Sequence, residues 1–127
     1  SVPVCAPYNG TVCSEFLQGR MVLHNNTMDY GNEAALDNLY SDTLSGSGAH
    51  DFCQRPALRL LCHQLYPDCE NQTLEPFPIC QESCLAVVTL FCFQELAEGY
   101  AKNLPSTEHC YTLPSKWDVP STCTDSD

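Results

Sequence analysis

Ten cysteines in a chain of 127 residues constrain the possible folds more than any other feature of this sequence. The number is even, and ten reduced thiols would be hard to explain in a cytosolic protein without a metal. Such a cysteine content is typical of disulfide scaffolds, in which each bridge adds typically ~2–4 kcal/mol to a thin apolar core. We therefore expect a secreted or cell-surface module, folded as one domain over residues 1–127 and held by five disulfides.

The charge balance excludes several kinds of partner. The chain has 16 acidic and five basic side chains, a formal net charge of −11. Nucleic acid and anionic membrane surfaces would repel such a chain. No run of about 18 apolar residues is present that would span a bilayer. Residues 1–4 carry neither a basic start nor an apolar run, so we expect that a signal peptide has been removed.

Three Asn-x-Thr sequons support an extracellular location. They begin at Asn9, Asn25 and Asn71. A single sequon arises easily by chance, but together with the cysteines the three favour surface glycans.

Hydrophobic periodicity predicts a small helical bundle. Residues 33–45 carry an apolar stripe at helical spacing, and the Gly-containing patch 45–48 ends that segment. A second helix is expected over residues 55–66, with Pro56 in its first turn. A third is expected over residues 79–98, ending before Gly99, and its buried stripe comprises Cys80, Cys84, Val87, Val88, Phe91, Cys92 and Leu96.

Fewer strands than helices are expected. Residues 21–24 are β-like, and one or two short strands are predicted near the N-terminus. A short helix is possible at residues 106–111, followed by an irregular tail that carries Trp117 and Cys123. The fold class is therefore mainly α, a small helical bundle stapled by disulfides.

Catalytic and metal-binding patterns are weak. A zinc site would have to use Cys62, His63, Cys80 and Cys84, but it would lack a second Cys-x2-Cys pair and leave six thiols unexplained. A secreted lipid hydrolase would need a helical His-Asp pair and a calcium loop, whereas His50 and Asp51 are expected in a solvated loop. We therefore expect no metal and no catalytic residues.

The cysteine spacing resembles that of the Frizzled-type cysteine-rich domain over essentially the whole chain. Cys5 and Cys13 enclose seven residues, Cys53 and Cys62 eight, Cys62 and Cys69 six, and Cys80 and Cys84 three. The interval from Cys84 to Cys92 encloses seven residues. Frizzled proteins usually have six there, and the Ror and muscle-specific receptor tyrosine kinases have seven. Residues 5–13 and 62–69 are similar to Ror, and residues 78–87 and 113–118 to muscle-specific kinase.

The spacing alone leaves the disulfide pairing open, although Cys80 and Cys84 lie one helical turn apart and should not bridge each other. The resemblance implies a specific pairing. The implied pairs are Cys5–Cys69, Cys13–Cys62, Cys53–Cys92, Cys80–Cys123 and Cys84–Cys110.

The resemblance also implies a receptor ectodomain that recognises a Wnt-type secreted ligand or a co-receptor, with the membrane span and the kinase elsewhere in the full polypeptide. No enzymatic activity is then expected of this chain. Related domains hold the acyl chain of the ligand in an apolar groove, so a fatty acid is a possible bound molecule and no other cofactor is expected. The candidate lining residues, in a groove or a closed cavity, are Leu36, Leu39, Tyr40, Leu44, Leu61, Val88, Phe91, Leu96 and Tyr100.

One alternative to lipid binding stays open at this point. The same apolar side chains could be packed core, because helical apolar stripes usually are. The domain would then be a protein–protein interaction, co-receptor or dimerisation module that holds no lipid.

Overall fold

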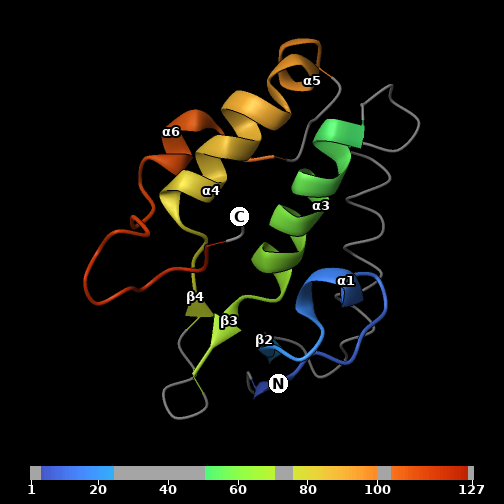
Figure 1. Ribbon diagram of the computed structural model, residues 1–127, viewed down its shortest axis with the longest axis vertical. Coiled ribbons are helices and arrows are strands. Elements are labelled where there is room, and N and C mark those ends of the chain that lie inside the picture. Colours follow the sequence, from blue (N-terminus) through green and yellow to red (C-terminus); the bar gives the residue numbers. More distant parts are fainter. Residues whose placement is uncertain (1–3, 25–50, 71–75, 100–103, 126–127) are drawn as a thin grey trace.

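A computed structural model describes residues 4–24, 51–70, 76–99 and 104–125. Helix α3 (Asp51–Leu65) runs through the middle of the molecule (Figure 1). On one side it contacts the helical segment of residues 81–97, and near its C-terminal end it contacts the short helix α1 (Ser14–Leu17). The expected helix 33–45 and the glycine-containing patch 45–48 lie outside the described residues.

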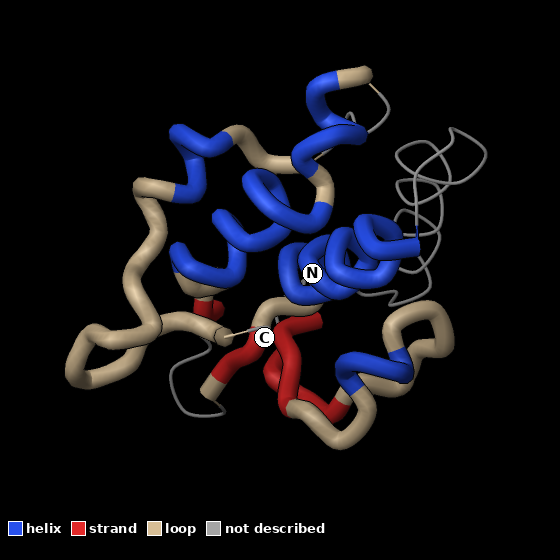
Figure 2. The backbone as a smooth tube through the Cα atoms, turned by 45° about the horizontal axis from the view of Figure 1, so that its top comes forward, coloured by secondary structure: helices blue, strands red, loops and turns tan. Residues whose placement is uncertain are grey.

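A small antiparallel sheet covers the end of the molecule where α3 finishes (Figure 2). Its order is β1 (Val4–Pro7), β2 (Met21–His24), β3 (Asp68–Cys69) and β4 (Pro76–Phe77). The predicted strand 21–24 and a partner near the N-terminus are confirmed, in the register that pairs residue 5 with residue 23. The sequence did not predict β3 and β4, because a strand of two residues is too short to show a period.

Helix α3 begins earlier than predicted. Asp51, expected in a loop, is its first residue, and Pro56 lies inside the helix rather than in its first turn. Proline removes one backbone hydrogen bond, the one to the carbonyl of Phe52 four residues before it. The helix continues past this point because its inner face is fully buried, with Cys53, Ala57 and Leu60 inaccessible to solvent.

The helix expected over residues 79–98 is three segments. These are α4 (Gln81–Ala86), a π-helical turn η1 (Val87–Phe91) and α5 (Phe93–Ala97). The π turn is closed by the amide of Cys92, which donates to the carbonyl of Val87 at 2.8 Å. A π turn is one residue wider than an α turn, so it shifts the helical register by one residue. Gly99 follows with a φ of +80°, which confirms the predicted helix end.

The C-terminal part returns to the sheet end. Helix α6 (Thr107–Cys110) is shorter than expected, and the hydroxyl of Ser106 caps it by accepting from the amide of His109 at 3.1 Å. Further on, Thr124 pairs with Ile79 in a parallel bridge beside the Cys80–Cys123 disulfide. The irregular tail is thus held at its end by backbone hydrogen bonds and a covalent link.

All ten cysteines are paired, and the pairs are those that the family resemblance implies. Two bridges leave α3 in opposite directions, one toward the N-terminal segment and one toward the end of η1. The five bridges are Cys5–Cys69, Cys13–Cys62, Cys53–Cys92, Cys80–Cys123 and Cys84–Cys110.

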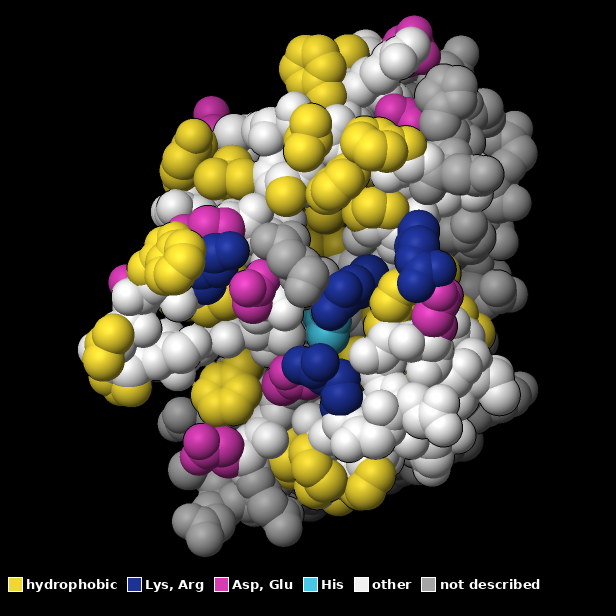
Figure 3. Space-filling view, viewed as in Figure 1, with side chains coloured by type: hydrophobic (Ala, Val, Ile, Leu, Met, Phe, Trp, Pro, Cys, Tyr) yellow, Lys and Arg dark blue, Asp and Glu magenta, His cyan; other side chains and the backbone are white. Residues whose placement is uncertain are grey.

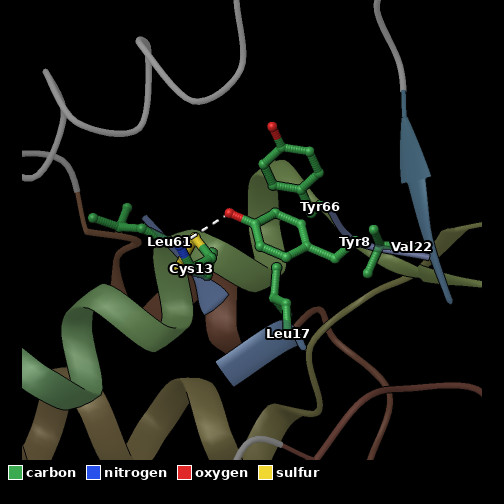
Figure 4. Packing of buried hydrophobic residues seen from close by; sticks show 7 residues of the cluster. Tyr8, Cys13, Leu17, Val22, Leu61 and Tyr66 are labelled. Atoms are coloured by element: carbon green, nitrogen blue, oxygen red, sulfur yellow. Dashed lines mark hydrogen bonds between the residues drawn. A yellow bond between two sulfur atoms is a disulfide. The ribbon is translucent and has the colours of Figure 1, made fainter. Parts of the chain in front are cut away.

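The N-terminal segment is joined to α3 by a buried cluster built around two tyrosines (Figure 4). The rings of Tyr8 and Tyr66 meet edge to face with centroids 5.1 Å apart. The Tyr8 hydroxyl accepts a hydrogen bond from the amide of Cys13 at 3.0 Å, and both groups are buried. The cluster is completed by Leu17, Val22, Leu61 and Cys62.

Replacing Tyr8 with Phe tests this hydrogen bond. We expect the free energy of unfolding to fall by ~1–3 kcal/mol, because the Cys13 amide is left buried without its acceptor. Urea denaturation followed by circular dichroism measures the change. Tyr111→Phe removes the same hydroxyl from an exposed ring and should leave the unfolding midpoint unchanged. Equal midpoints for wild type and Tyr8→Phe would contradict the assignment.

Candidate ligand-recognition surface

The residues predicted to line a lipid groove do not form one groove in the described part of the chain. Leu61 packs in the tyrosine cluster, and Val88 packs against the Cys84–Cys110 bridge. Phe91 and Leu96 pack on the cluster around Cys53 and Cys92, and Leu96 also reaches that of Val88. The other five predicted residues lie outside the described residues: Leu36, Leu39, Tyr40, Leu44 and Tyr100.

One of the predicted residues, Phe91, borders a hollow of about 350 Å³ on the surface, which Gln94 and the buried Glu95 also line. Phe52, Leu90 and Phe93 also border it, and each is more than 60% exposed. The rings of Phe52 and Phe91 meet edge to face with centroids 5.0 Å apart. We call these four apolar residues the Phe91 surface.

The Phe91 surface lies over the end of the molecule where α3 begins and α5 lies. Hydrophobic side chains gather there in the space-filling view (Figure 3). Phe52 comes directly before Cys53, and Phe93 comes directly after Cys92. The buried Cys53–Cys92 disulfide therefore holds both aromatic residues at the same hollow. Leu90 and Phe91 come from the π turn. Contiguous exposed apolar side chains of this size mark interaction sites more often than chance.

Phe52, Leu90 and Phe93 were not among the lining residues predicted from the sequence. That prediction used the buried apolar stripe of each helix, and these three residues lie outside the stripes. A large apolar residue directly beside a buried cysteine would have indicated Phe52 and Phe93, because neighbouring positions on a helix face in different directions. Leu90 has no such indication in the sequence.

At the sheet end of the molecule, Asp68 of β3 accepts hydrogen bonds from two other segments of the chain. Its carboxylate accepts from Nε and Nη2 of Arg20 at 3.2 and 2.6 Å, and from the hydroxyl of Thr124 at 2.9 Å. Burial raises the pKa of Asp68, but these hydrogen bonds and the charge of Arg20 outweigh it, and the pKa lies below its ordinary value. One carboxylate therefore joins the β1–β2 end of the chain to its C-terminal segment.

His63, in the last turn of α3, is 2% exposed, and neither ring nitrogen has a hydrogen-bond partner. Burial, together with the charges of Arg20 and Arg59, lowers the pKa of His63 to about 4, against the opposing effect of Asp68. The imidazole is therefore neutral at physiological pH. Its candidate co-ligands for zinc, Cys62, Cys80 and Cys84, are all in disulfides. Among the described residues no cluster of metal-ligating side chains is found.

These features define a class of protein: a small extracellular module whose disulfides fix an exposed apolar surface. The model of the Fz domain family matches residues 5–117, most of the chain, and the chain belongs to this family. Fz domains are non-catalytic, cysteine-rich extracellular modules that generally bind Wnt ligands. This membership supersedes the hydrolase alternative, whose Asp51 lies in α3 and whose His50 is outside the described residues. None of the described helices is long and apolar enough to cross a membrane.

The buried neutral His63 should make stability fall in mild acid. Its pKa is lower in the folded than in the unfolded chain, so the unfolded chain binds more protons between pH 6.5 and about 4. The stability is therefore present in full above pH 6.5 and is lost as the pH falls through this range. We expect a loss of ~2 kcal/mol between pH 7 and pH 5, measured by urea denaturation at both values.

Two variants isolate the contribution of His63. His63→Leu should remove most of the difference between pH 7 and pH 5, whatever it does to stability at pH 7. Substitution of the exposed His109 with Gln should leave the difference intact. An unchanged pH dependence in His63→Leu would show that another group is responsible.

Proposed function

We propose that this chain is the ligand-recognition domain of a Ror-like receptor tyrosine kinase in Wnt-type signalling. The seven-residue interval between Cys84 and Cys92 supports the Ror or muscle-specific kinase branch. The π turn lies inside that interval and supplies the path for one additional residue. In this proposal the full polypeptide also contains a single membrane-spanning segment and a cytoplasmic kinase domain.

We further propose that the Phe91 surface contacts the acyl chain of the ligand. The observation that carries this proposal is the hollow of about 350 Å³ between Phe52, Leu90, Phe91 and Phe93, three of which are largely exposed. An acyl chain gains of order 0.8 kcal/mol for each CH₂ that it buries, before the costs of binding. Phe91 belongs both to this surface and to the lipid-lining residues predicted from the sequence.

A second function, binding a protein partner without lipid, is favoured by a separate observation. Leu61 and Val88, two of the expected lining residues, are buried core residues in different clusters. The Phe91 surface would then be the apolar centre of a protein–protein contact. The two functions differ in whether the acyl group of the ligand matters.

Truncating the Phe91 surface tests both functions. The double variant Leu90→Ser, Phe93→Ser should fold normally, since both side chains are exposed, and should bind an acylated Wnt-type ligand about 10–100-fold more weakly. Biolayer interferometry on the immobilised domain measures this, with the deacylated ligand in parallel. A loss confined to the acylated ligand supports acyl recognition, and an equal loss with both ligands supports the protein contact.

A matched control removes exposed apolar area elsewhere. Trp117 and Val119, 76% and 96% exposed, lie in the loop after α6. Trp117→Ser, Val119→Ser should leave ligand binding unchanged. If it weakens binding as much as the double variant, or if the double variant binds normally, the Phe91 surface is not the recognition site.

Glycosylation of Asn9 is expected from the extracellular location. The side chain is exposed in the turn after β1. Expression in a eukaryotic secretory system should give a glycoprotein whose peptide containing Asn9 shifts in mass after enzymatic deglycosylation. Thr11→Ala removes this sequon and should abolish the shift at that peptide alone.

A further inference from the structure

Arg59 has no carboxylate partner among the described residues, in a chain that has about three acidic side chains for every basic one. Arg20 is paired with Asp68, Arg55 with Glu15, and Lys116 lies 3.8 Å from the carboxylate of Asp125. Within the described residues Arg59 has no ion pair, and its Nε is buried without an acceptor. None of the described acidic side chains therefore neutralises the charge of Arg59.

Arg59 lies at a hollow of about 360 Å³ between α1, α3, α4 and η1. Its guanidinium is 6.0 Å from the ring centroid of Phe16, and that of Arg55 is 5.6 Å from the same centroid. Two cations therefore share one aromatic ring at the hollow. The helical segment across from α3 contributes the apolar side chains of Val87 and Phe91 and the polar side chain of Ser83.

Two arginines and the neutral His63 form a row along one face of α3. Arg55, Arg59 and His63 are spaced four residues apart, and residues at that spacing lie one above another on a helix. Burial is the main cause of the lowered pKa of His63, and the charges of Arg20 and Arg59 add to it against the effect of Asp68. Lys and Arg side chains gather across the middle of this face in the space-filling view (Figure 3).

We propose that this hollow binds a carboxylate attached to an apolar group, with Arg59 as its principal ligand and Arg55 beside it. A guanidinium presents a planar fork of donors that matches the two oxygens of a carboxylate. The buried Nε–H of Arg59 gains the acceptor that it lacks. The apolar part of the ligand packs on Phe16, Val87 and Phe91.

The polar neighbours restrict the ligand to a single acidic group. Glu15 also lines the hollow, and its carboxylate is an acceptor that is already held by Arg55. The hydroxyl of Ser83 donates to Asp125 at 2.9 Å rather than to the ligand. The arginines are therefore the donors that a ligand meets here. A long polyanion would extend beyond the basic row over a chain of net charge −11. A single carboxylate within the screening length of about 8 Å experiences mainly the local arginines. It can come from a free small molecule or from an acidic side chain beside an aromatic one in a protein partner.

Nuclear magnetic resonance of the whole 15N-labelled domain tests the proposal. The probes are phenylacetate, for a free ligand, and a blocked Phe-Asp dipeptide, for a partner side chain, at constant ionic strength. We expect a saturable shift of the Arg59 Nε–H signal with at least one of them, and the probe that gives it identifies the source. Phenylacetamide has the same shape without the charge and should give no saturable shift of that signal.

Two variants with the same change of charge locate the site. Arg59→Gln should weaken binding of the effective probe about 10–100-fold, the effect of losing hydrogen bonds to a charged group. Lys116→Gln should leave its affinity unchanged. The proposal is overturned if neither probe gives a saturable shift in the wild-type domain, if phenylacetamide shifts the Arg59 signal as phenylacetate does, or if both variants lose affinity equally.

Discussion

The two disulfides of α3 are the constraint on which the rest of the molecule depends. Cys53 and Cys62 are both fully buried, and they tie the central helix to the end of η1 and to the start of α1. The Phe91 surface is formed where the first bridge joins α3 to η1, and the hollow at Arg59 is formed between α3 and both of its partners. Each surface is thus composed of elements whose relative position is fixed covalently.

Asp68 supplies a noncovalent link at the other end. Three segments that are distant in the sequence meet at its carboxylate: the start of β2 through Arg20, β3 itself, and the C-terminal segment through Thr124. Each hydrogen bond donated to a carboxylate is stronger than one between neutral groups. A two-residue strand has little stability of its own, so this centre and the Cys5–Cys69 bridge together explain why β3 persists.

The sequence predicted the parts of the fold that depend on long-range spacing. The intervals between cysteines led to the family, and the implied pairs are the pairs in the structure. The strand 21–24 and the helix end at Gly99 were predicted from local pattern and are confirmed. The π turn was missed because a stripe with a period of 3.6 residues hardly changes when one turn is wider. The early start of α3 was missed because Pro56 was assigned to the first turn by its usual preference.

The candidate surfaces were less predictable than the fold. Helical periodicity predicts the side chains that face the core, whereas Phe52, Leu90 and Phe93 are exposed on the surface. The row of Arg55, Arg59 and His63 was also present in the sequence. The sequence does not show that Arg55 pairs with Glu15, or that Arg59 has no ion pair among the described residues. Those two structural facts identify Arg59 as the candidate ligand-binding residue of the row.

The π turn between Cys84 and Cys92 has a consequence for how such a domain can diverge. Each residue added to or removed from a helix rotates everything after it by about 100°. Here both ends of the interval are held by bridges to Cys110 and Cys53, so the cysteines themselves cannot turn. A one-residue insertion or deletion in this interval can be accommodated by a change between an α-helical and a π-helical turn. Such a change alters the direction of the exposed side chains near Leu90. A change of one residue in length can therefore alter the outward face of this segment while every disulfide stays in place.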